Sequence, residues 1–85
     1  MRKIAKVFNH AVIKRVMIYS NNDMTYLFLY NTLQDLGCLY DQWFKTLTEA
    51  EKVCKEIYNI DKKDWQVIAD PLPSCRNDRI SPVKI

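Results

Sequence analysis

The chain has 85 residues and a formal net charge of +3, with 48% hydrophobic and 27% charged residues. This balance is typical of a soluble globular domain and excludes a disordered chain. With a single glycine the chain cannot build a glycine-rich phosphate loop, and its apolar runs fall short of the ~18 residues that span a bilayer. We expect one domain over residues 1–73, followed by a C-terminal tail over residues 74–85.

The first half of the chain predicts a series of strands. Residues 4–12 fit either a helix or a strand and stay open, whereas residues 12–19 are rich in β-branched side chains and predict a strand. The cluster Ser20–Asp23 is typical of a hairpin turn, because Asn and Asp tolerate left-handed conformations. A second strand is expected over residues 25–32.

The next turn contains Gly37, which can adopt a positive φ, and a third strand is expected over residues 38–44. A helix then follows. Thr46 and Glu49 form a capping box, and Asn59 is a suitable C-terminal cap. The apolar positions that recur at helical spacing are Ala50, Val53, Cys54, Ile57 and Tyr58.

A fourth strand is expected over residues 65–69, and Pro71 and Pro73 then end regular structure. The tail can add a short edge strand around Ile80 and Val83, limited to an edge by Pro82. The predicted order β-β-β-α-β indicates an α+β fold, in which one helix packs on one face of an antiparallel sheet of three to four strands. Which face the helix covers is not decided by the pattern.

The second predicted strand has two apolar faces. Side chains alternate along a strand, so Leu27 and Leu29 point to one side of the sheet and aromatic residues point to the other. The candidate interaction face comprises Tyr19, Tyr26, Phe28, Tyr30 and Tyr40. Because small monomers rarely expose large apolar patches, three explanations compete: the tail covers this face, a second copy covers it, or it is a binding platform.

The function that these features favour is that of a small non-catalytic interaction module. It would associate with itself, as a homodimer, or with another protein, through the aromatic face or a strand edge. The alternative is nucleic-acid binding, because residues 1–20 carry five basic residues and no acidic residue. In that alternative Lys14 and Arg15 contact phosphates while sheet aromatics stack on bases.

Residues Phe44–Ala50 resemble the strand-to-helix junction in the arm-binding domain of tyrosine recombinases. That resemblance covers about seven residues and implies a three-stranded sheet that enters the DNA major groove. The chain departs from the family where basic, glycine-containing strands are expected. The second predicted strand has no charged residue, and the third carries Asp41.

Chemistry-bearing residues are few and dispersed. Cys38, Cys54, Cys75 and His10 lack the close spacing of metal ligands, so we expect no bound metal and no cofactor. A catalytic thiolate needs a positioned base, and the single histidine lies far along the chain from Cys75. An odd number of cysteines and an N-terminus interrupted by charges predict a cytoplasmic protein that does not enter membranes.

Overall fold

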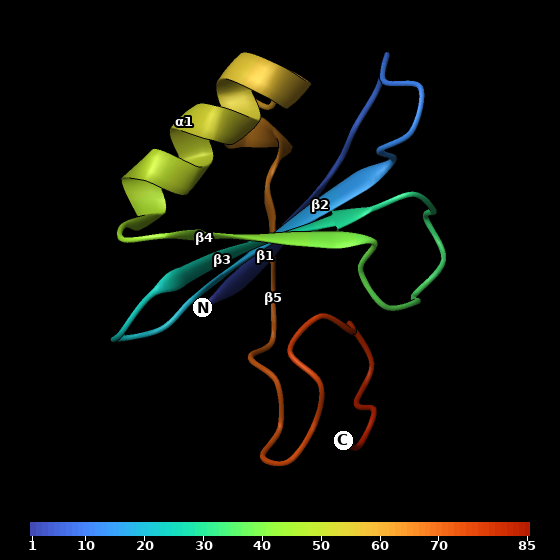
Figure 1. The fold of residues 1–85 in the computed structure, drawn as a ribbon, viewed down its shortest axis with the longest axis vertical. Coiled ribbons are helices and arrows are strands. Elements are labelled where there is room, and N and C mark those ends of the chain that lie inside the picture. The colour runs from blue at the N-terminus through green and yellow to red at the C-terminus, as the bar shows by residue number, and fades with distance from the viewer.

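A computed structural model describes all 85 residues. Helix α1 (Leu47–Tyr58) packs on an antiparallel sheet whose strand order is β4-β3-β2-β1-β5 (Figure 1). The strands are β1 (Arg2–Lys6), β2 (Arg15–Ser20), β3 (Thr25–Tyr30), β4 (Tyr40–Phe44) and β5 (Gln66–Ile68). A short 3₁₀ turn, η1 (Lys62–Asp64), precedes β5. The predicted α+β class, with one helix on an antiparallel sheet, is confirmed.

The sheet has five strands, one more than the largest number predicted, because residues 2–6 form β1. This strand pairs with β2 on one side and with β5 on the other. The first two basic residues of β1 are both buried, and both have partners. The Lys3 ammonium lies 2.5 Å from the Glu51 carboxylate of α1, and the Arg2 guanidinium donates hydrogen bonds to backbone carbonyls. Because those partners are distant in sequence, the basic residues at positions 2 and 3 did not indicate a strand in the interior of the sheet.

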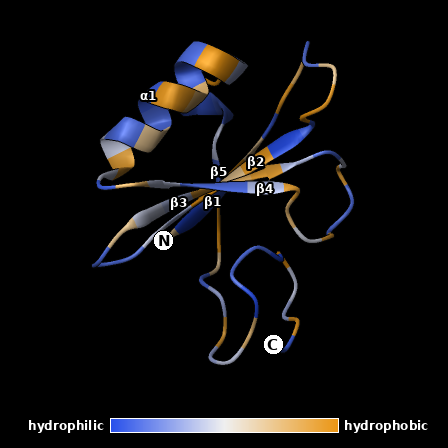
Figure 2. Cartoon of the chain, viewed as in Figure 1, coloured by the Kyte–Doolittle hydropathy of each residue, from blue (hydrophilic) through white to orange (hydrophobic).

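Helix α1 begins and ends where the capping residues predict. The Thr46 hydroxyl accepts a hydrogen bond from the Glu49 amide at 3.2 Å. Asn59 adopts a left-handed φ of 56°, and its amide binds the carbonyls of Cys54 and Lys55. Figure 2 shows apolar and polar residues alternating along α1, which is the pattern of a helix with one buried face.

The helix covers the Leu27 and Leu29 face of the sheet, which settles the choice left open by the sequence. The main core joins this face to two fully buried helix residues, Ala50 and Cys54. Val53 packs at the edge of this core, whereas Ile57 is 58% exposed. The buried stripe of the helix is therefore narrower than the apolar pattern predicts.

The opposite face holds a smaller cluster of Met17, Phe28 and Tyr30, with Ile80 of the tail packed against it. Figure 1 shows the sheet nearly edge-on, with α1 on one side and the C-terminal segment on the other. The edge strand expected in the tail does not form. Residues 74–85 instead double back on themselves through a single bridge between Cys75 and Lys84.

Gly37 does not adopt the positive φ that its turn position suggested. Its role is to permit close packing. A Cβ atom at this position would lie 3.2 Å from Nη2 of Arg76 and 3.4 Å from the Asp78 carboxylate. The loop before β4 can therefore lie directly against the tail.

Candidate functional site

The aromatic face predicted from β3 exists on the side of the sheet away from the helix. Tyr19 and Tyr26 are directly opposite each other on β2 and β3, and their ring centroids are 6.3 Å apart. The rings of Tyr26 and Phe28 stack at 5.9 Å. These side chains form a continuous row that ends at Tyr30.

The tail covers one end of this row. Tyr30 is fully buried, and its hydroxyl donates a 2.6 Å hydrogen bond to the carbonyl oxygen of Asp78. Phe28 is also buried, whereas Tyr19 and Tyr26 are half-buried. Among the three explanations for the aromatic face, the tail accounts for the burial of Tyr30 and most of Phe28. A second cavity, of about 600 Å³, lies between Tyr26, Phe28 and residues of the tail.

Charged side chains hold the tail in place through backbone groups. The Asp35 carboxylate accepts hydrogen bonds from the amides of Ile80 and Ser81, both at 2.8 Å. Burial by itself would raise the pKa of Asp35, but the two amides and the nearby Arg79 together lower it. On the sheet side, Arg2 donates to the carbonyls of Ala69, Asn77 and Arg79.

Asp78 connects the tail to the loop before β4. Its carboxylate accepts the Cys38 amide at 2.9 Å and both Nε and Nη2 of Arg76 at 3.1 Å. Burial opposes ionisation of Asp78, yet the Cys38 amide and the Arg76 guanidinium outweigh it and lower the pKa of this carboxyl. An ionised Asp78 therefore stabilises the covered state of the aromatic face.

Tyr40 does not belong to the aromatic face, which corrects the predicted set. It pairs with Leu29 in the register of β3 and β4, so its side chain lies on the helix side of the sheet, and it is 61% exposed. The side-chain period of a strand is two residues, so a register that differs by one residue reverses the face. The pairing register of β3 and β4 depends on the length of the loop between them, and the sequence pattern did not define that length.

Trp43 takes the place that was predicted for Tyr40. It lies opposite Tyr26 in the register, is 55% exposed, and donates its indole N–H to the Met24 sulfur at 3.0 Å. Four of the five residues of β4 are exposed, and the strand has no neighbour on its outer side. The exposed aromatic surface is thus at the β4 edge.

The basic N-terminal region does not form an exposed patch. Lys14 is exposed and its ammonium donates to the His10 carbonyl at 3.1 Å. Arg15 is only 3% exposed, and its guanidinium lies over the Tyr30 ring at 4.1 Å. Since Arg2 and Lys3 are also buried, Lys6 and Lys14 are the remaining exposed lysine and arginine side chains of residues 1–20. Arg15 therefore cannot contact a nucleic-acid backbone as predicted.

The three cysteines are free, and Cys54 and Cys75 are buried. Burial raises the pKa of the Cys54 thiol to about 12, and burial together with Asp78 raises that of Cys38 to about 11. Both are therefore thiols at neutral pH, without the thiolate that nucleophilic catalysis needs. No three side chains among the Cys, His, Asp and Glu residues lie close enough together to hold a metal ion.

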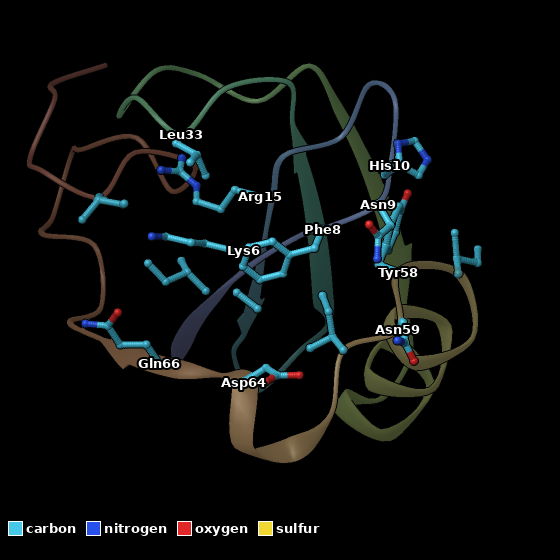
Figure 3. A pocket seen from close by; sticks show the side chains of 15 residues that line it. Lys6, Phe8, Asn9, His10, Arg15, Leu33, Tyr58, Asn59, Asp64 and Gln66 are labelled. Carbon is cyan, nitrogen blue, oxygen red and sulfur yellow. The ribbon is translucent and has the colours of Figure 1, made fainter.

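One cavity lies beside β1, where the strand extends past the end of β5. It has a volume of about 660 Å³ and is lined by 15 residues, which Figure 3 shows as sticks. Lys6, Arg15 and Leu33 lie together at one end, Phe8 lies near the middle, and Asn59 lies at the helix end. The sequence pattern did not single out Lys6, Phe8 or Leu33, because Leu33 is about 25 residues from the other two and only the fold brings them together.

No protein-family model, no curated protein and no solved structure matches this chain. The sheet also has five strands, where the arm-binding domain of tyrosine recombinases has three. The one helix, of 12 residues, is neither long enough nor apolar enough to cross a membrane. The residues of the chain itself therefore supply the argument for function.

Proposed function

We propose that this protein is a small non-catalytic interaction module that pairs with a second copy of itself through the free edge of β4. The observation that supports this function is the exposure of β4, whose outer backbone groups face no other strand. Unpaired edge strands readily accept another strand, and proteins commonly protect them with lysine or proline. Residues 40–44 contain neither of these and carry one charge, at Asp41.

The side chains around this edge suit a strand partner. Trp43 and Tyr40 project from opposite faces of β4, so an added strand would contact one aromatic residue on each side of the sheet. Trp43 continues inward to Tyr26, which extends the apolar surface beyond the edge. A β4–β4 pairing is self-complementary and closes as a two-fold dimer. We also propose a cytoplasmic location, supported by the three free cysteines.

The test is sedimentation velocity over a concentration series from about 1 to about 200 μM. We expect reversible dimerisation in the unmodified chain and a monomer in Trp43→Lys, which places a charge beside the paired edge. Val67→Lys is the matched control, because Val67 is an exposed residue of β5, the other edge strand. A monomer at every concentration, or equal loss of dimer in Val67→Lys, would show that β4 is not the interface.

A further inference from the structure

Arg15 is a buried cation without an acidic partner. It is 3% exposed and forms no ion pair, and its Nε and Nη2 atoms donate no hydrogen bond. The Tyr30 ring lies against the face of the guanidinium, but the N–H groups lie in the guanidinium plane and need acceptors of their own. Since a buried donor without an acceptor is costly, these two N–H groups indicate a place where an acceptor binds.

Arg76 of the same chain shows how the Nε and Nη2 atoms of an arginine bind when an acceptor is present. Nε and Nη2 of Arg76 bind the two carboxylate oxygens of Asp78, each at 3.1 Å. This paired arrangement matches the spacing of the oxygens in a carboxylate or a phosphate. In Arg15 the same two atoms are unused.

A second cation lies directly opposite. Lys6 pairs with Arg15 in the register of β1 and β2, lines the same cavity, and forms no ion pair. Like charges in directly opposed positions of a sheet repel, and an anion placed between them relieves that repulsion. Asp64, the one acidic residue that lines the cavity, lies away from Arg15 in Figure 3 and accepts the Asp61 amide at 2.8 Å.

The walls around the two cations are apolar. Leu33 lies on the Arg15 side of the cavity, and the exposed ring of Phe8 projects near its middle (Figure 3). Ile80 of the tail also lines the cavity and packs against the cluster that contains Tyr30. Leu33 belongs to the loop between β3 and β4 and lies beside the guanidinium of Arg15, and both residues line the cavity (Figure 3). The volume of about 660 Å³ is in the range of small-molecule sites.

We propose that Lys6 and Arg15 bind the phosphate of a small phosphate monoester whose apolar part packs against Leu33, Ile80 and Phe8. A phosphate monoester carries nearly two negative charges at neutral pH, which matches the two cations. The burial of Arg15 excludes the backbone of a polymer and leaves room for a compact group. This site is on β1 and β2 and is independent of the β4 edge.

Isothermal titration calorimetry at about pH 7.5, where the monoester is mostly dianionic, tests the site with phenyl phosphate. We expect phenyl phosphate to bind at least about tenfold more tightly than inorganic phosphate, because only the ester buries an apolar group. Phenol, which lacks the anion, should not bind. Lys6→Met should weaken phenyl phosphate binding about tenfold or more, and Arg15→Lys should do so through loss of the paired donors.

Lys14→Met is the matched control, because Lys14 is a neighbouring exposed lysine that does not line the cavity. It should change the affinity less than about twofold, as expected for a charge outside the contact. Undetectable binding of phenyl phosphate, or equal weakening by Lys6→Met and Lys14→Met, would overturn the proposal. If Arg15→Lys does not fold, the exposed position of Lys6 lets the Lys6→Met comparison decide alone.

Discussion

Replacing Tyr30 with Phe tests whether the tail is a structural part of the domain. The change removes one hydroxyl group and keeps the ring that packs on Met17 and beneath Arg15. The hydroxyl donates to the Asp78 carbonyl at 2.6 Å in a fully buried position. The variant therefore removes one tail contact and leaves the aromatic packing in place.

The expected loss of stability depends on the lost hydrogen bond and on whether the Asp78 carbonyl oxygen is left without a donor. A neutral buried hydrogen bond contributes about 1 kcal/mol net, and a buried acceptor left without a donor costs about 1–3 kcal/mol. Asp78 is itself buried, at 7% exposed, so in the variant its carbonyl oxygen has little access to water as a replacement donor. We therefore expect Tyr30→Phe to lower the free energy of unfolding by about 1–3 kcal/mol.

Urea denaturation measures this loss, and thermal melting should show a fall in Tm of about 4 °C or more for a domain of this size. Tyr40→Phe is the control, because Tyr40 is exposed and makes no hydrogen bond through its hydroxyl; it should change stability by less than about 0.5 kcal/mol. A Tyr30→Phe variant as stable as the Tyr40→Phe control would refute the reasoning that the tail is bound through this contact.

Two further predictions concern acid stability and the helix. The pKa values of Asp35 and Asp78 lie below their ordinary value of 3.8, so the stability that they contribute is present above that pH and is lost as the pH falls through the lowered values. Urea titrations from about pH 6 to about pH 2.5 should therefore show a weaker pH dependence in Asp78→Asn, and an unchanged slope would contradict the assignment. On the helix, Val53→Asp should lower the free energy of unfolding by about 2 kcal/mol or more, whereas Ile57→Asp should cost less than about 1 kcal/mol. Equal losses in denaturant titrations would show that the buried stripe includes Ile57.

The helix could be predicted because its signals are local. Thr46 and Asn59 bind backbone groups within a few residues, and the apolar spacing lies within one segment. The exposure of Ile57 could not be predicted, because it depends on the direction in which α1 crosses the sheet. The covering of the aromatic face likewise depends on hydrogen bonds such as that from Tyr30 to Asp78, which are 48 residues apart.

The sequence by itself determined the α+β class, the hairpin at Asn21 and the two-faced character of β3, because turns and side-chain alternation are short-range properties. The Asn21 side chain accepts the amides of both Asp23 and Met24, as its turn position suggests. Tertiary structure alone decided that the tail covers Tyr30, that Trp43 rather than Tyr40 continues the aromatic row, and that Arg15 is buried beside Lys6. Those outcomes depend on strand register and on contacts between distant segments, which local pattern does not specify.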